Sequence, residues 1–249
     1  MLKAVLFDWG GTLMQDEWSD DIALEGYAAG LSAIPGDHLP DAQALLRYFQ
    51  DNSEQLFSLD DLDEIDIAAV MGSGFTHHGA DLPDDHIRLF LTASHDVFAS
   101  YYSLASTTHA LLEALRRRGL KLALVSNTAS PEWLLRPVLE RQGLVERLDA
   151  VVLSSELGKR KPHPAMFEQA LAEVGAVPAE ALFVGDRLDA DILGASRVGI
   201  KTVQALWFRA DDAEVPVEPD FQAFTQMDVL NAVERLSPGH DDSRASSRR

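Results

Sequence analysis

The chain has 249 residues, of which 46% are hydrophobic and 24% charged, so its composition is that of a globular protein rather than a disordered or fibrous one. Its net charge of −19 argues against sequence-independent binding to nucleic acid or anionic membranes, and the lack of cysteine excludes disulfides, thiolate catalysis and cysteine-ligated zinc. No apolar run could span a membrane, and Asp8 interrupts the N-terminal apolar run too early for a signal peptide. We therefore expect a soluble, cytoplasmic protein; its oligomeric state is left open.

Short apolar runs bounded by polar residues or glycine recur along the chain and predict buried strands of a parallel sheet. These runs lie at residues 4–7, 122–125, 150–153, 182–184 and 202–203. Amphipathic helices are predicted between them, over residues 107–119, 164–175 and 189–199. Alternating strands and helices predict a Rossmann-like, doubly wound α/β sheet.

The connection between the first two strands is much longer than one helix requires. Within it, residues 15–105 contain 18 acidic and only two basic residues, and their apolar side chains follow a helical period. We predict a helical cap over 15–105, without strands, inserted into a core formed by 1–14 and 106–237. The polar residues 238–249 are predicted to be a disordered tail.

Polar residues follow the predicted strands, at the sheet edge where open α/β proteins bind ligands. Asp8 follows the first strand, Ser126 the second, and Asp186 a later one. Lys161 lies just before a helix that starts at Pro164. Carboxylates, a hydroxyl and an ammonium group at one edge can hold a divalent cation and a phosphate together.

Four segments in this order resemble the four motifs of the haloacid dehalogenase-like hydrolase superfamily, and the helical insertion follows the first motif as in members with that type of cap. The segments are Asp8-Trp9-Gly10-Gly11-Thr12-Leu13, Leu124-Val125-Ser126-Asn127, Gly158-Lys159-Arg160-Lys161-Pro162-His163-Pro164 and Val184-Gly185-Asp186-Arg187-Leu188-Asp189-Ala190-Asp191. The resemblance implies a hydrolase in which Asp8 is the nucleophile and becomes an aspartyl-phosphate. It implies that Ser126 and Lys161 hold the phosphoryl oxygens, with backbone N–H groups of Gly11 and Asn127.

The resemblance also implies a Mg²⁺ ion bound by Asp8, the backbone carbonyl of Gly10 and Asp186, with Asp191 supporting the ion or the lysine. The chain departs from most phosphatases of this superfamily at Gly10, where they have a second aspartate that acts as general acid and base. Loss of such a group typically costs about 10²–10⁴-fold in rate. Three explanations are consistent with Gly10. The enzyme uses substrates with good leaving groups, it takes the proton from a water or a cap residue, or it has lost turnover.

The sequence favours a phosphatase that acts on a small phosphorylated metabolite, and a phosphomutase is disfavoured because it needs the missing acid–base group twice. The acidic cap favours a substrate whose cap-facing part is neutral or cationic. Two alternatives stay open. One is a metal-independent dehalogenase, which Asp186 disfavours, and the other is a phosphate- or metal-binding module without turnover.

Other polar residues have simpler interpretations. Asp189 is expected to cap a helix, and an EF-hand loop is rejected because the required glycine and distal glutamate are absent. The pair His77-His78 is expected in a polar surface loop, and His95 is expected to pack in a helix. The run 116–118, three arginines, is expected to stabilise a helix C-terminus.

Overall fold

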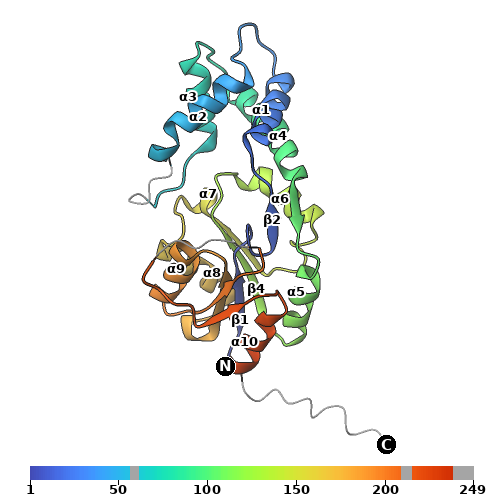
Figure 1. Cartoon of the computed structure of the whole chain (residues 1–249), viewed down its shortest axis with the longest axis vertical. Coiled ribbons are helices and arrows are strands. Elements are labelled where there is room, and N and C mark those ends of the chain that lie inside the picture. The colour runs from blue at the N-terminus through green and yellow to red at the C-terminus, as the bar shows by residue number, and fades with distance from the viewer. Residues whose placement is uncertain (57–61, 209–214, 238–249) are drawn as a thin grey trace, which may run out of the picture.

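The computed structural model describes residues 1–56, 62–208 and 215–237. These residues form an elongated molecule with a sheet-containing core at one end and helices at the other (Figure 1). In the described part of the chain, six parallel strands form one sheet in the order β5-β4-β1-β6-β7-β8. The strands are β1 (Ala4–Phe7), β4 (Lys121–Ser126), β5 (Ala150–Leu153), β6 (Ala181–Gly185), β7 (Lys201–Ala205) and β8 (Phe221–Ala223). The predicted α/β sheet is confirmed, and β8 is a strand that the apolar pattern did not reveal.

Helices cover both faces of this sheet, because successive side chains of each strand point to opposite faces. In β1, Val5 and Phe7 pack on one face, and Ala4 and Leu6 pack on the other. The first face is covered by α5 (Thr108–Arg117), α6 (Glu132–Arg141) and α10 (Asp228–Leu236). The second is covered by α8 (Pro164–Val174) and α9 (Leu193–Arg197). Shorter helical turns complete the core: α7 (Ser154–Leu157), η1 (Pro178–Glu180) and the π-helical turn η2 (Leu188–Ile192).

The inserted segment is helical, as predicted, and its helices lie beyond the carboxyl edge of the sheet (Figure 1). They are α1 (Asp20–Ala33), α2 (Ala42–Leu56), α3 (Ile67–His77) and α4 (Asp84–Ser100). Their apolar faces form a cluster that is separate from the two clusters of the sheet. Leu134 of α6 joins this cluster, and the Arg88 guanidinium of α4 lies 3.9 Å from the centre of the Trp133 ring. The cap therefore contacts the core through α6.

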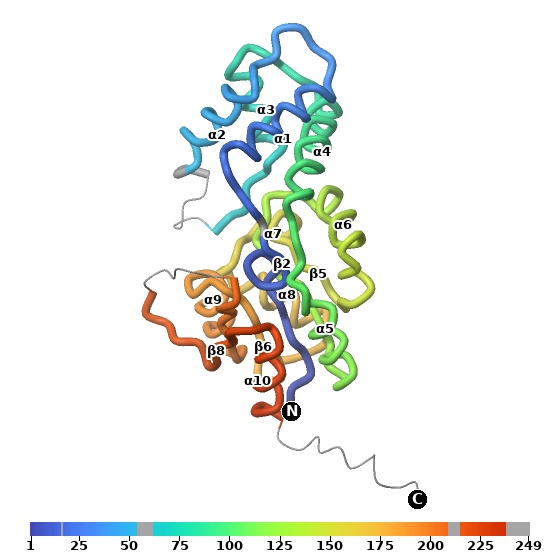
Figure 2. The backbone as a smooth tube through the Cα atoms, turned by 45° about the vertical axis from the view of Figure 1, so that its right-hand side comes forward, coloured from blue at the N-terminus to red at the C-terminus, as the bar shows by residue number. Residues whose placement is uncertain are grey.

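The expectation that the inserted segment contains no strand is wrong at both of its ends. Strands β2 (Met14–Asp16) and β3 (Tyr102–Leu104) pair in an antiparallel ladder, so the chain enters and leaves the cap through adjacent segments (Figure 2). Each strand has only three residues, which is too short for an alternating pattern to appear in the sequence. The predicted tail, residues 238–249, lies outside the described residues.

Two glycines allow α1 and α4 to approach closely. A Cβ atom at Gly26 would lie 2.1 Å from Phe98, and one at Gly30 would lie 2.3 Å from the hydroxyl of Ser94. Larger side chains at these positions would separate the helices.

In the described chain, no helix combines the length and apolar character that crossing a bilayer requires.

His95 is buried in α4 beside the connection to the core, and replacing it is expected to change how stability depends on pH. Its exposure is 4%, its ring packs edge-on against Tyr102, and its Nε2 has no hydrogen-bond partner among the described residues. Burial lowers the pKa of His95 to about 4, with Arg141 acting in the same direction and Asp96 opposing. The unfolded chain therefore binds a proton between pH 6.5 and 4 that the folded chain does not bind, which destabilises the fold as pH falls.

The wild type should lose up to about 3 kcal/mol of unfolding free energy between pH 7 and pH 4 through this group. A His95→Phe variant keeps a ring but cannot titrate, so it should lose less. Urea unfolding of both proteins at pH 7 and pH 4.5 measures the difference, and groups that titrate in both proteins cancel. Equal losses in the two proteins would show that His95 does not carry this pH dependence.

Candidate active site

The carboxyl ends of three neighbouring strands bring the predicted residues to one place. Asp8 directly follows β1, Ser126 ends β4, and Asp186 directly follows β6. Strand β1 lies between β4 and β6, so these three residues share one sheet edge. The Asp8 N–H donates to the carbonyl of Val184, 2.9 Å away, which extends the pairing of β1 and β6 into the site.

Three carboxylates gather at this edge. One side-chain oxygen from each of Asp8, Asp186 and Asp191 lies within 4.8 Å of the others. Their exposures are 7%, 9% and 1%, so little water reaches them. Clustered anions in a dry site are unfavourable unless cations balance them.

Lys161 supplies one balancing charge. Its Nζ lies 2.5 Å from Asp8 Oδ1 and 2.8 Å from Asp191 Oδ1, and its side chain is almost completely buried. Burial opposes the charged amine, but Asp191 and Asp8 outweigh it and raise the pKa of Lys161. Burial raises the pKa of Asp8 to about 7 despite the opposing charge of Lys161, and Asp191 and Asp186 push it further up. One ammonium against three carboxylates leaves an excess of negative charge.

The Asn127 side chain holds the backbone of Lys161, a contact that sequence reasoning missed. Its Nδ2 donates to the Lys161 carbonyl at 3.0 Å, and its Oδ1 accepts from the Lys161 N–H at 2.7 Å. This paired contact links the loop after β4 to the loop before α8. The predicted role of the Asn127 backbone N–H in phosphate binding stays a prediction.

Comparison with known proteins identifies the family of the chain. A family model described as haloacid dehalogenase-like hydrolase matches residues 2–199. The chain belongs to this family. The resemblance inferred from the four motifs is thereby confirmed.

Curated relatives of this hydrolase are named as phosphatases. A glyceraldehyde 3-phosphate phosphatase of Methanopyrus kandleri is 31% identical over 95% of this chain and 99% of that protein. A phosphoserine phosphatase of Thermus thermophilus is 40% identical over 53% of this chain and 51% of that protein. The predicted class, a phosphoric monoester hydrolase of this superfamily, agrees with these names.

Solved structures of the family share the fold of this hydrolase. A phosphatase from Thermococcus onnurineus superposes with a TM-score of 0.63, at 23% identity over 93% of this chain and 98% of that chain. A 2-haloacid dehalogenase from Pseudomonas syringae superposes with a TM-score of 0.65, also at 23% identity, over 94% of this chain and 99% of that chain. At 23% identity the likeness to these structures shows the fold alone. The reaction must therefore be inferred from the residues of the site.

The turn after Asp8 contains two glycines with different constraints. A Cβ atom at Gly11 would lie 2.7 Å from Asp186 Oδ2, and its φ of +77° is rarely adopted by other residues. At Gly10, a Cβ atom would meet none of the described residues within 4 Å. Gly11 is therefore required by the backbone and by the closeness of Asp186, whereas Gly10 leaves space for a side chain.

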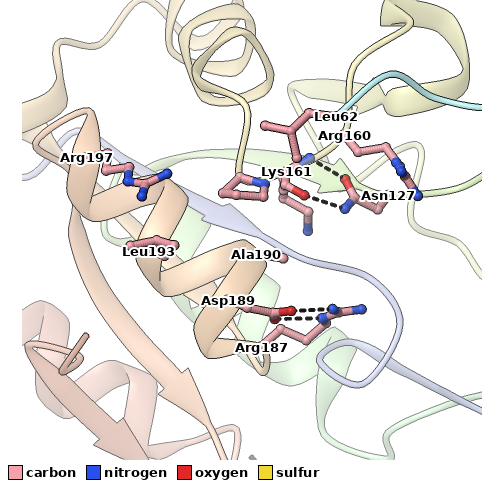
Figure 3. Close-up of a pocket in the computed structure, with 10 residues that line it drawn as sticks. Leu62, Asn127, Arg160, Lys161, Arg187, Asp189, Ala190, Leu193 and Arg197 are labelled. Atoms are coloured by element: carbon pink, nitrogen blue, oxygen red, sulfur yellow. Dashed lines mark hydrogen bonds and ion pairs between the residues drawn. The ribbon is translucent and has the colours of Figure 1, made fainter. Parts of the chain in front are cut away.

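An open pocket of about 530 Å³ lies beside Lys161 and Asn127 (Figure 3). Its lining includes Arg160, Arg187 and Arg197, so the core adds basic groups to a site whose cap is acidic. A negatively charged group of a substrate could therefore find basic partners on the core, whereas the expectation of a neutral or cationic cap-facing part depends on the cap residues and stays a prediction.

Two minor expectations need correction. Asp189 lies inside the turn η2 rather than before it, and its carboxylate pairs with Nε and Nη2 of Arg187 at 3.0 and 2.6 Å. His77 ends helix α3 and His78 is its C-cap residue, so the pair is not in a loop. The run 116–118 does lie at the C-terminus of α5, as predicted.

Proposed function

We propose that this hydrolase is a Mg²⁺-dependent phosphatase that acts on a small phosphorylated metabolite through an aspartyl-phosphate at Asp8. The observation that carries the proposal is the buried contact between Asp8 and Lys161 beside Asp186 and Asp191. A nucleophilic carboxylate next to a fixed ammonium is suited to a transferring phosphoryl group, whose oxygens carry the developing charge.

The donor set fits Mg²⁺. All three side chains in the cluster offer oxygen, which this ion prefers, and the cluster carries more negative charge than Lys161 balances. Asp8, Asp186 and the Gly10 carbonyl would hold the ion. Asp191 would act mainly through Lys161, because its Oδ1 faces the ammonium and its Oδ2 accepts from the Arg187 N–H at 3.0 Å. The bound ion would reduce the repulsion between the Asp8 carboxylate and the substrate phosphate.

In the first step, an oxygen of Asp8 attacks phosphorus and the bond to the substrate oxygen breaks. Lys161 and the hydroxyl of Ser126 would hold the phosphoryl oxygens, with the N–H groups of Gly11 and Asn127. In the second step, a water attacks the phosphorus of the aspartyl-phosphate, which releases phosphate and restores the Asp8 carboxylate. Gly10 offers no side chain to protonate the leaving oxygen, so a water, a cap residue or the substrate itself would supply that proton.

A phosphate-release screen with and without Mg²⁺ tests the proposal. The panel should contain sugar phosphates, amino-alcohol phosphates, phosphorylated hydroxy acids and nucleoside diphosphates, with p-nitrophenyl phosphate as a substrate that needs no leaving-group proton. Mg²⁺-dependent release that EDTA stops would support the phosphatase. Chloride release from 2-chloropropionate in EDTA would instead support the dehalogenase alternative, and binding of phosphate without any turnover would support a binding module.

A cytoplasmic location stays a prediction, which cell fractionation would test.

A further inference from the structure

A short segment of the cap pairs with the loop that carries Lys161. The Arg160 N–H donates to the carbonyl of Leu62 at 2.7 Å, and the Glu64 N–H donates to the carbonyl of Gly158 at 3.1 Å. Between these bonds the two segments form an antiparallel bridge. The cap backbone therefore fixes the residues that directly precede Lys161.

The side chain of Glu64 reaches the second loop through one buried hydroxyl. Ser154 is completely buried, and its Oγ donates to Glu64 Oε2 at 2.5 Å. The same oxygen accepts from the Thr128 N–H at 2.7 Å. Thr128 lies two residues after Ser126, so the Ser154 hydroxyl links Glu64 of the cap to the loop that follows β4.

The two loops are also joined to each other, by the paired contact between the Asn127 side chain and the Lys161 backbone. The contacts form a closed circuit, to which the described part of the cap contributes residues 62–64. We propose that Glu64 is a positioning residue: through Ser154 it fixes the loop that follows Ser126 and carries Asn127 relative to Lys161. This inference rests on the proposed function, because it assigns both loops to phosphate binding.

The carboxylate of Glu64 is suited to this role for two reasons. A hydroxyl donates more strongly to a charged oxygen, and 2.5 Å is typical of such charge-assisted bonds. The hydroxyl hydrogen of Ser154 has a second acceptor, the Thr128 carbonyl at 3.2 Å. Glu64 keeps the hydrogen on the cap side, so removing its carboxylate would let the hydroxyl turn to Thr128 and loosen the link between cap and loop.

Glu64→Ala removes the acceptor, and Glu64→Gln keeps one oxygen acceptor with no charge. Asp66→Asn is a matched control, since it removes the same charge two residues away. Asp66 is exposed and caps α3 by accepting from the N–H groups of Ala68 and Ala69, a role in which asparagine is about as good. Melting temperatures show whether each variant folds, and Glu64→Gln replaces Glu64→Ala if the latter does not.

We expect Glu64→Ala to lower kcat/KM for p-nitrophenyl phosphate roughly 10- to 100-fold, the scale expected when reacting groups are misplaced. Glu64→Gln should lose less, and Asp66→Asn should change the rate less than about twofold, as most exposed substitutions do. The affinity for inorganic phosphate with Mg²⁺, measured by calorimetry, should fall with kcat/KM in Glu64→Ala. A role in fold stability alone would lower the melting temperature without weakening phosphate binding by folded protein.

A double-mutant cycle tests the route through the hydroxyl. If Glu64 acts through Ser154, the variant with both residues changed to alanine should be no worse than the poorer single variant. Additive effects, or wild-type kcat/KM and phosphate affinity in Glu64→Ala, would overturn the inference. A wild type without Mg²⁺-dependent turnover would contradict the proposed function instead, and the calorimetric comparison needs no turnover.

Discussion

An Asp8→Asn variant is expected to release no measurable phosphate from any monoester that the wild type hydrolyses, a decrease on the order of 10⁶-fold in kcat. The amide cannot form the acyl-phosphate bond, and it carries no negative charge that would balance the ammonium of Lys161. The variant should nevertheless fold. Burial raises the pKa of Asp8 to about 7 against the opposing charge of Lys161, so burial disfavours the charged form and a neutral side chain of the same shape is tolerated.

Steady-state phosphate release measures the loss of activity, and the melting temperature shows whether the variant folds. Asp85→Asn is a suitable control, because it also removes one carboxylate but lies exposed in the first turn of α4. An Asp8→Asn protein that keeps more than about one hundredth of the wild-type kcat would contradict the nucleophilic role, since loss of a covalent nucleophile costs far more than that.

The Gly10→Asp variant is expected to gain rate, by about 10²–10⁴-fold on substrates whose leaving group is an alkoxide. The new carboxyl could protonate the leaving oxygen and then take a proton from the attacking water. The structure has space for it, because a Cβ atom at Gly10 meets no described residue within 4 Å and the backbone is not left-handed. The gain on p-nitrophenyl phosphate should be much smaller in the first step, since its leaving group needs no proton.

Comparison of an alkyl phosphate with p-nitrophenyl phosphate in each variant checks this expectation. Gly10→Asn has nearly the same size but transfers no proton, so it should show no gain. An equal gain in the Gly10→Asn variant would show that proton transfer by the new carboxyl is not the cause. Gly11→Ala, in contrast, should lose activity, because its Cβ would lie 2.7 Å from Asp186 Oδ2 on a left-handed backbone. Failure of both the wild type and Gly10→Asp to turn over any substrate would favour the binding module.

Much of the candidate site could be predicted because it depends on strand ends. Asp8, Ser126 and Asp186 each follow a short apolar run, and parallel strands bring such positions to one edge. The contacts of Lys161 could not be predicted in this way. It is 153 residues from Asp8, and its loop belongs to no strand, so only the packed chain shows that its ammonium lies between Asp8 and Asp191.

Residues that act through other residues left no signal in the sequence. Glu64 lies in an acidic stretch of the cap, where composition indicates only a solvated surface. Its contact with Ser154 joins positions 90 residues apart. Gly10 and Gly11 are likewise the same residue type in one motif, and only the left-handed backbone and the closeness of Asp186 distinguish them.

The sequence by itself determined the parallel sheet, the helical insertion and the kinds of polar group at the strand ends. Those features follow from hydrophobic periodicity and turn chemistry, which act over a few residues. The tertiary structure alone decided which oxygen lies beside which cation, how the cap meets the loops, and which glycine can be replaced. These depend on packing between segments far apart in the chain, where a shift of an ångström makes or breaks a hydrogen bond.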